Sequence, residues 1–474
     1  MAGLPSVASE RPANDAEGSL SGTLELDGEP FPVTVGYASR ISLHVSFQGE
    51  TPPDQTTFSR FRLSLDGRTV ELSACRLHVE YTRAGYSGRL IFVEDVYDCR
   101  ALLFDHRVVN LKAFFQKLPL VLAQKESVRP EFKDYVSNCL YDMAVWKRFF
   151  NEQDRIFANE PIYVADAAQQ ALLRSEGREF FRFFDGQLDL LRQLVQGYTK
   201  EEHERHGYYL RRHAWEFILA SEFLKRTNLK PRGYVGDADM MVMTYENQFV
   251  GNYVFNRLMH KHPVETPAAQ AVRNRRRLVP SLIREVRERF GPPEREFRFL
   301  SLAAGPAWEL QDILLSPEDF QAFHVSLLDQ DQHALESARS VVRRIEAARD
   351  SRARVRYLND SVRTMLRARD LVTKMGGRYH FIYSMGLFDY LTPPVARVIL
   401  RKMLELVVPG GSVFVGNYHV GNPTRHYMEY WMDWVLYYRT EDEFAGLAED
   451  LGVEVKVSFE ETRCQMFLQL DKPG

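Results

Sequence analysis

The chain has 474 residues, more than one hydrophobic core normally organises, so two or three domains are expected. Hydrophobic residues make up 45% of it, and 61 basic side chains nearly balance 64 acidic ones, which leaves a formal net charge of −3. Such a composition is typical of a globular protein and excludes a global electrostatic attraction to nucleic acid or to anionic membranes.

Neither the start of the sequence nor its cysteines indicate export. No basic segment followed by an apolar run stands at the amino terminus, and no apolar stretch reaches about 18 residues, the length that would span a bilayer. The cysteines Cys75, Cys99, Cys139 and Cys464 lack metal-ligand spacing. We therefore expect a cytoplasmic protein with reduced, mostly buried thiols and no membrane span.

The first hundred residues predict a tail and a small β-domain. Residues 1–20 are rich in Ala, Ser, Pro and Glu, which indicates disorder. From 21 to 107 the hydrophobic period is near two, and Asp-Gly pairs at 27–28 and 66–67 suit tight turns, so we expect an antiparallel β-barrel.

In size and hairpin rhythm this β-domain resembles PilZ domains. The resemblance implies binding of cyclic di-GMP, for which those domains use an RxxxR sequence and a later D/N-x-S-x-x-G pattern. Only Ser39-Arg40-Ile41-Ser42 is a fragment of such a pattern. A nucleotide ligand at this domain therefore stands as a hypothesis beside a structural role or the docking of a protein.

Residues 108–290 predict a helical module. Segments such as 179–198 carry apolar residues at spacings of three and four, which is typical of amphipathic helices. Later in the module, the two glycines of GYVGD (233–237) allow a hinge or a tight turn. We interpret Tyr234, Asp237 and Met241 as a lid or substrate wall, with a purely structural turn as the alternative.

Two clusters of titratable side chains in this module are ambiguous. Arginines at 273, 275, 276 and 277 either contact an anionic substrate or form a solvated face with ion pairs. His203, His206 and His213 have helical spacing, but charged residues surround them in the sequence. We expect these histidines to face solvent, and we predict no metal site.

From 291 to 474 apolar runs alternate with helical segments. The runs at 297–303, 324–329, 354–358, 379–384 and 411–418 have the length and composition of strands that are buried on both faces. This alternation predicts a doubly wound α/β sheet, that is, a Rossmann-like domain. Such sheets bind ligands at the carboxyl ends of their strands.

Small and polar residues follow the first three of these strands. The turn Ala304-Gly305-Pro306-Ala307 allows close approach of a ligand, and Asp329 ends the next strand, where its carboxylate can accept both hydroxyl hydrogens of a ribose. The third strand leads into Asn359, Asp360 and Ser361, which suit an adenine edge. The absence of a Walker lysine and of G-x-G-x-x-G counts against ATP and NAD.

After the fourth strand, the sequence continues with GLFDYL (386–391), a helix and the turn VPGG (408–411). This arrangement resembles class I S-adenosylmethionine-dependent methyltransferases. The resemblance implies a seven-stranded, mostly parallel sheet whose terminal antiparallel hairpin is supplied by 453–472, and S-adenosyl-L-methionine as the cofactor. Ser301 or Ala303 stands where many members carry an acidic residue. The implied cofactor-binding residues are Ala304, Gly305, Pro306, Ala307, Asp329, Gln330, Asn359, Asp360, Ser361 and Ser384.

Further motifs narrow the resemblance. They are GYVGDADMM (233–241), AAGPA (303–307), LLDQDQHAL (327–335), GLFDYL, GNYH (416–419) and MEYWMDWVLYYRTEDE (428–443). Together they are similar to the 3-hydroxypalmitic acid methyl ester biosynthesis methyltransferases, bacterial enzymes that esterify a fatty-acid carboxylate. The resemblance implies a small carboxylate or fatty-acid-like substrate. The matched positions imply catalytic or positioning roles for Asp389, Tyr390, Asn417 and His419, and substrate contacts by Trp434 and Arg439.

Three functions remain open at this point. A carboxylate acceptor is already ionised at neutral pH and needs no strong general base. If the acceptor is instead a hydroxyl or an amine of a small molecule or a protein, His419 is the candidate base. The third alternative is a sensor or scaffold that binds the cofactor without catalysis.

Overall fold

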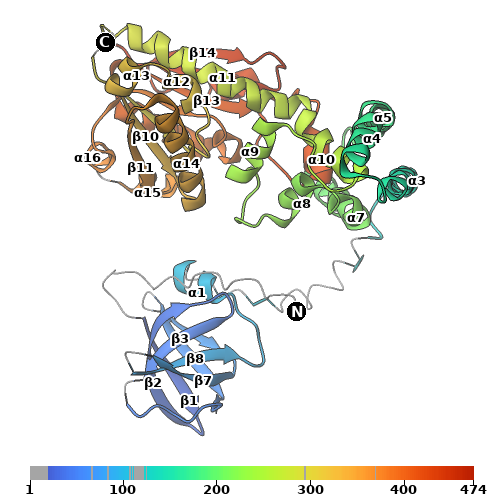
Figure 1. Ribbon diagram of the computed structural model, residues 1–474. Coiled ribbons are helices and arrows are strands. Elements are labelled where there is room, and N and C mark those ends of the chain that lie inside the picture. The colour runs from blue at the N-terminus through green and yellow to red at the C-terminus, as the bar shows by residue number, and fades with distance from the viewer. Residues whose placement is uncertain are drawn as a thin grey trace. The chain divides into compact units, whose positions relative to one another are not determined.

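The computed structural model describes residues 20–47, 49–65, 68–82, 85–105, 108, 110–111, 122–123, 125–292, 295–368 and 370–474. The chain divides into two compact units, Met1–Ser127 and Val128–Gly474, which are coloured blue and green to red in Figure 1. Residues 1–19 of the predicted tail and the predicted Asp66-Gly67 turn lie outside the described residues.

The first unit is an eight-stranded antiparallel sheet in the order β4-β7-β8-β3-β2-β1-β5-β6. At the first predicted turn, Asp27 and Gly28 have φ angles of 51° and 86°, as a tight hairpin turn requires. Because only Ser59 separates β4 from β5, one chain segment pairs with both β7 and β1, which closes the sheet into a barrel. The strands are β1 (Leu20–Leu26), β2 (Glu29–Ala38), β3 (Ser42–Phe47), β4 (Thr57–Phe58), β5 (Arg60–Leu65), β6 (Arg68–Leu72), β7 (Cys75–Thr82) and β8 (Gly85–Phe92), followed by helix α1 (Cys99–Asp105).

The second unit begins with helices, as the periodicity predicts. They are α3 (Pro130–Phe157), α4 (Ile162–Arg174), α5 (Glu176–Leu194), α6 (Lys200–His213), α7 (Trp215–Ile218), α8 (Glu222–Leu229), α9 (Ala238–Glu246), α10 (Val254–Glu265) and α11 (Pro267–Glu288). Side-chain caps define several starts. At α6, Thr199 and Glu202 form a reciprocal capping box that satisfies backbone N–H groups of the first turn.

The expected solvent exposure of the histidine trio is wrong for His206, which is fully buried. Its Nε2 accepts a hydrogen bond from the backbone N–H of Arg129 at 3.1 Å, and its Nδ1–H donates to the carbonyl of Glu202 at 2.7 Å. Burial lowers the pKa of His206, consistent with a neutral ring. The sequence context misled because the charged neighbours occupy the other faces of α6.

The rest of the second unit is a seven-stranded sheet in the order β11-β10-β9-β12-β13-β15-β14. The first five strands pair in parallel, and β15 and β14 form the antiparallel hairpin. The predicted fold class is confirmed. The strands are β9 (Phe297–Leu302), β10 (Phe323–Asp329), β11 (Arg354–Asn359), β12 (Tyr379–Ser384), β13 (Val407–Tyr418), β14 (Glu454–Phe459) and β15 (Gln465–Asp471).

Helices cover this sheet and connect it to the helical layer. They are α12 (Leu310–Ile313), α13 (Pro317–Ala322), α14 (Gln332–Arg349), α15 (Val362–Arg367), α16 (Leu371–Met375), the 3-10 helix η1 (Phe388–Tyr390), α17 (Pro393–Leu406), α18 (Arg425–Trp431) and α19 (Glu441–Ala445). The long helix α11 contacts α9, α12 and β12 and so runs from the helical layer to the sheet (Figure 1). One buried cluster contains Phe184 of α5 and Trp431 of α18, so the two layers share a core.

All four cysteines are buried and free, as predicted. Burial raises the pKa of the Cys75, Cys99 and Cys139 thiols to about 12, so these thiols are protonated and unreactive at neutral pH. Among the described helices, none is both long and apolar enough to cross a membrane.

Candidate active site

The carboxyl ends of β9 and β10 meet at a strained bend. After β9, Ala303, Gly305 and Ala307 have positive φ angles of 56°, 58° and 50°. Such angles are uncommon for residues other than glycine and cluster at functional sites. The bend is closed by a hydrogen bond of 2.9 Å from the backbone N–H of Gly305 to Oδ2 of Asp329.

Asp329 is buried and held from both sides. Its Oδ1 accepts a second hydrogen bond, 2.9 Å long, from the backbone N–H of Asp331. Burial raises the pKa of Asp329, whereas these N–H groups oppose the rise. A carboxylate can accept about four hydrogen bonds, so both oxygens keep capacity to accept hydroxyl groups of a ligand.

A cavity of about 600 Å³ opens at this bend. Its size lies within the range of small-molecule and cofactor sites. The cavity brings together predicted residues that are up to 156 positions apart in the sequence. The predicted residues in its lining are Tyr234, Met241, Ala304, Gly305, Pro306, Asp329, Gln330, Asp360, Ser361 and Tyr390.

Three predicted cofactor residues lie outside this lining and support it. The amide of Asn359 donates to the carbonyls of Asp329 and Gln330, both at 3.1 Å, which ties β11 to the turn after β10. The hydroxyl of Ser384 is buried and donates to the carbonyl of Leu302 at 2.7 Å. Ala307 is buried at the end of the strained bend.

Three residues predicted from the strand ends or from 428–443 form a brace that holds the backbone. Arg439 donates to the carbonyls of Phe388 and Leu391 and to Oδ1 of Asn417. Asn417 in turn donates to the carbonyls of Tyr418 and Tyr437. His419 pairs with Glu441 at 3.0 Å. The structure therefore places Arg439, Asn417 and His419 outside the cavity lining, where they hold the segment after β13.

Asp389 lies in a smaller compartment that adjoins the cavity. This compartment is also lined by Tyr390, Trp434, Tyr418 and Arg275. Oδ1 of Asp389 accepts a hydrogen bond of 2.7 Å from the backbone N–H of Tyr418. Trp434 donates to the hydroxyl of Tyr390 at 2.9 Å, and that hydroxyl donates to the carbonyl of Val235 at 2.8 Å.

Asp389 makes stability depend on pH. Burial raises the pKa of Asp389 to about 6, from an ordinary value of 3.8, so the folded state holds this proton more tightly than the unfolded state. Its contribution to stability is therefore present below about pH 4 and is lost as the pH rises through 6. We therefore expect the Tm of the wild type to fall between pH 4 and pH 7 by the contribution of this proton. The isosteric variant Asp389→Asn should not show this part of the fall.

Thermal unfolding followed by tryptophan fluorescence over this pH range measures the effect. The exposed Asp350 at the end of α14 offers the control variant Asp350→Asn, which should keep the wild-type pH dependence. Parallel Tm curves for the wild type and Asp389→Asn would contradict the prediction.

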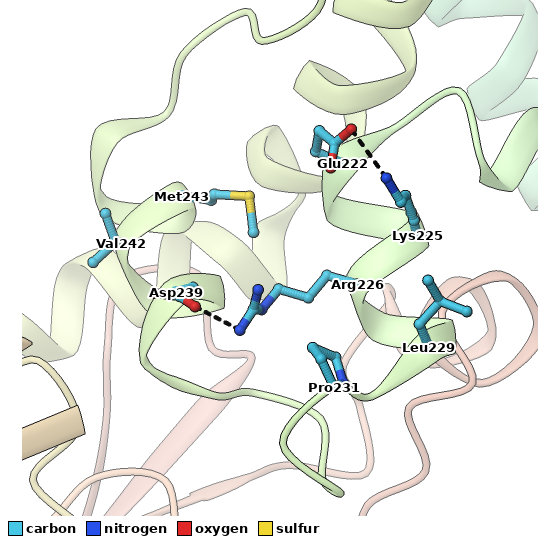
Figure 2. Close-up of a pocket in the computed structure, with 8 residues that line it drawn as sticks. All are labelled: Glu222, Lys225, Arg226, Leu229, Pro231, Asp239, Val242 and Met243. Atoms are coloured by element: carbon cyan, nitrogen blue, oxygen red, sulfur yellow. Dashed lines mark ion pairs between the residues drawn. The ribbon is translucent and has the colours of Figure 1, made fainter. Parts of the chain in front are cut away.

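The predicted lid is anchored by a charged clamp. Asp237 caps α9 by accepting from the backbone N–H of Met240, and its two carboxylate oxygens share the single Nε–H of Arg226, each at 2.9 Å. Arg226 also pairs with Asp239 at 2.5 Å, across a separate cavity of about 470 Å³ between α8 and α9 (Figure 2). Asp239 accepts a further hydrogen bond from His333 of α14. Asp237 thus positions Tyr234 and Met241 without lining the site.

The lining also contains Tyr245, Glu309 and Tyr383, which the sequence did not place in the site, and Arg275, whose role the sequence left open. Glu309 is buried, accepts a hydrogen bond of 2.7 Å from the hydroxyl of Tyr383, and makes no ion pair among the described residues. Burial raises the pKa of Glu309. A signal for Arg275 was present, because it occupies a position in the apolar stripe of α11 where Val272 and Val279 lie one turn away on either side.

The histidines at 203, 206 and 213 do not converge on one point in the structure. His203 lies instead beside His426 and Glu429 of α18, with the potential ligand atoms within 4.8 Å of one another. Nδ1 of His203 is hydrogen-bonded to the hydroxyl of Tyr430 at 2.9 Å, and Arg425 holds one carboxylate oxygen of Glu429 at 2.9 Å. This cluster joins α6 to α18.

Solved structures to which this chain is similar include S-adenosylmethionine-dependent methyltransferases. The magnesium protoporphyrin IX methyltransferase from Synechocystis, solved with bound cofactor, has 11% identity, covers 43% of this chain and 83% of its own, and has a TM-score of 0.30. An O-methyltransferase family protein from Burkholderia thailandensis has 15% identity, with 59% and 76% coverage and a TM-score of 0.33.

A protein from Bordetella parapertussis described as a possible exported protein has 17% identity, covers 61% of this chain and 95% of its own, and has a TM-score of 0.41. No protein-family model and no curated protein matches the sequence. The narrower resemblances to PilZ domains and to the 3-hydroxypalmitic acid methyl ester enzymes thus have no support from these comparisons. These similarities concern the fold alone.

Proposed function

We propose that the second unit binds S-adenosylmethionine in the 600 Å³ cavity and methylates a small molecule there. The observation that carries the proposal is the bend closed by Asp329, whose carboxylate keeps hydrogen-bonding capacity directly beside the backbone of Gly305. This pairing suits a ribose next to a closely approached backbone. Asp360 and Ser361, at the end of the neighbouring strand, extend the polar wall for an adenine.

The cavity also suits the positive charge of this cofactor. Asp329, Glu309 and Asp360 are acidic side chains in its lining, and Glu309 has no cationic partner within ion-pair distance among the described residues. A buried carboxylate without such a partner is costly unless a ligand supplies the cation. Glu309 can therefore take the place of the acidic residue that is missing from the first strand of the sheet.

The acceptor that the site favours is a carboxylate. Among the described residues that line the cavity there is no histidine, lysine or cysteine. Burial raises the pKa of Tyr245 to about 12 and raises the pKa values of Tyr234 and Tyr383 further, so none of these hydroxyls is a base at neutral pH. A carboxylic acid is ionised without help, and methyl ester formation follows from positioning alone.

The bound cofactor would supply a methyl carbon on a positive sulfur, and as the carboxylate oxygen bonds to that carbon, the carbon–sulfur bond breaks with its electron pair going to sulfur. No proton has to be removed. The protein's contribution is to align the acceptor and to exclude water. Apolar side chains of Leu387, Leu391 and Val395 border the same cavity, which fits a fatty-acid-like acceptor.

One observation favours a second candidate acceptor. Glu309 is a carboxyl group with a raised pKa inside the cavity, which is a property of general bases. If Glu309 removes a proton from the acceptor, the acceptor is a hydroxyl or an amine. The pH dependence of kcat distinguishes the two, because only the second acceptor requires Glu309 to be deprotonated and so adds a loss of kcat at acid pH that Glu309→Gln abolishes.

Two experiments test the proposal in order. Calorimetric titration with S-adenosylmethionine and S-adenosylhomocysteine should show binding of both, and its absence would exclude the methyltransferase function. Incubation with radiolabelled cofactor and a panel of fatty acids, alcohols and amines should then yield labelled methyl esters. Binding without turnover on any acceptor would instead favour a cofactor-binding sensor.

Glu309→Gln is expected to weaken binding of S-adenosylmethionine about tenfold, because it removes one charged partner of a buried cation. If the partner is the sulfonium, the affinity for S-adenosylhomocysteine, which lacks that charge, should change much less. Isothermal titration of both ligands measures the difference. The control is Glu318→Gln on α13, an exposed side chain outside the cavity. Unchanged affinity for both ligands would remove Glu309 from the cofactor site.

A further inference from the structure

Arg275 is a charged residue on the buried side of α11. Val272 and Val279, one turn before and one turn after it, are buried, and Arg275 itself is only 8% exposed. Arginine is rarely buried unless it is paired, because removing its charge from water is costly. The position of Arg275 therefore requires an explanation that the packing of α11 does not provide.

The guanidinium has few partners. Nη1 donates to the carbonyl of Met385 at 2.8 Å, directly after β12, and to Oε1 of Gln465 at 3.5 Å, and Nη2 contacts the sulfur of Met241 at 3.5 Å. Among the described residues, no carboxylate lies within 4.0 Å of it. Asp389 and Glu309 act on it only from a greater distance, and the charge of Arg275 opposes the rise of their pKa values.

Three other arginines of the same helix are paired. Arg276 forms an ion pair of 2.8 Å with Asp312, and Arg284 and Arg287 both contact Asp319 at 3.4 Å. Among the described arginines of α11 without an ion pair, Arg275 is the buried one, whereas Arg273 is half-buried and Arg277 is exposed. Arg275 also lines both the main cavity and the compartment beside Asp389 and Trp434, so its free face is open to a ligand.

Gly386 lies against this face. A Cβ atom at Gly386 would be in van der Waals contact with the guanidinium, 3.4 Å from Nη2 of Arg275. Gly386 also follows β12, at the same edge of the sheet as the bend at Gly305. The guanidinium of Arg275 therefore lies in the cavity that we assign to the cofactor, near the end of β12.

We propose that Arg275 binds the carboxylate of the acceptor. The inference rests on the proposed function and specifies it: the acceptor enters with an anionic head, one oxygen of which pairs with Arg275 while the other faces the methyl group. As the O–C bond forms and the C–S bond breaks, the acceptor loses its negative charge and the sulfur its positive charge. Apolar side chains of Leu387 and Leu391 line the same cavity and suit the body of the acceptor.

The test compares an anionic ligand with its neutral analogue. Wild type, Arg275→Gln, Arg275→Lys and the control Arg277→Gln, an exposed arginine of the same helix, are first titrated with S-adenosylhomocysteine. Dodecanoate and dodecanol are then titrated into each protein saturated with this product. We expect the wild type and Arg277→Gln to bind dodecanoate about 10- to 100-fold more tightly than dodecanol, the range of a charge-assisted hydrogen bond.

Loss of this preference in Arg275→Gln, with partial recovery in Arg275→Lys and unchanged binding of S-adenosylhomocysteine, would support the proposal. If Arg275→Gln weakens S-adenosylhomocysteine and keeps the preference for dodecanoate, the guanidinium serves the cofactor and the proposal is overturned. Wild type that binds S-adenosylhomocysteine without preferring dodecanoate also overturns it. Failure of wild type to bind S-adenosylhomocysteine refutes the proposed function itself. Arg275→Lys serves as the reporter if Arg275→Gln unfolds.

Discussion

Alanine at position 329 is expected to weaken binding of S-adenosylhomocysteine by about 1–3 kcal/mol, the cost of losing hydrogen bonds to a charged group. The variant removes the carboxylate that we assign to the ribose and also releases the backbone N–H of Gly305, so the bend after β9 loses its closure. Both effects act on the same ligand. Isothermal titration calorimetry measures the loss.

Two further proteins make this result interpretable. Asp329→Asn keeps an oxygen that can accept from Gly305 but lacks the charge, so an intermediate affinity is expected. Asp350→Asn replaces an exposed aspartate at the end of α14 and should bind as the wild type does. An affinity of Asp329→Ala equal to that of the wild type would show that the cofactor does not occupy the bend.

The variant Phe184→Ala is expected to lower the free energy of unfolding by about 3–5 kcal/mol, the usual cost of truncating a buried phenylalanine. The ring is fully buried and meets Trp431 edge to face, with centroids 5.1 Å apart, as well as His262 at 4.6 Å. Phe184 lies on α5 and Trp431 on α18, so the cavity left behind would weaken the joint between the helical layer and the α/β sheet.

Urea unfolding followed by tryptophan fluorescence measures this loss selectively. All five tryptophans lie between residues 146 and 434, so the signal reports on the second unit alone. Leu190→Ala on the same helix truncates a side chain that is 51% exposed and should change stability by no more than about 0.5 kcal/mol. A loss below 1 kcal/mol for Phe184→Ala would mean that the two layers do not depend on this contact.

The joint has a functional consequence. Tyr234 reaches the cavity from the segment between α8 and α9, and Met241 reaches it from α9, whereas Asp329 and Gly305 reach it from the sheet. The site is therefore assembled from both layers, and the clamp of Arg226 with Asp237 and Asp239 sets where the helical contribution lies. Figure 2 shows the Arg226–Asp239 pair of this clamp. A weaker contact between the helical layer and the sheet should therefore reduce binding of the acceptor more than binding of the cofactor.

The local sequence determined the sheet and one wall of the site. Runs of apolar residues such as 324–329 and 379–384 form strands that are buried on both faces, and such strands carry apolar side chains at nearly every position. The segments between them have the period of helices, and helical connections join strands that run parallel. Since parallel strands end at one edge, Gly305 and Asp329, 24 residues apart, had to lie close together. Their pairing followed from the strand ends alone.

Tertiary packing decided the rest of the site. The apolar stripe of α11 indicates that Arg275 is buried, but only the packing of α11 against the sheet decides what its guanidinium meets, here the carbonyl of Met385. The position of a residue at the end of a strand also predicts only that it lies at the edge of the sheet, and does not predict where its side chain points. Asn417 and His419 end a strand as Asp329 does, but the segment 437–441 pairs with them there, and their side chains satisfy its backbone and Glu441. Which polar groups face a ligand was thus settled by long-range contacts, because every buried donor and acceptor must first find a partner within the fold.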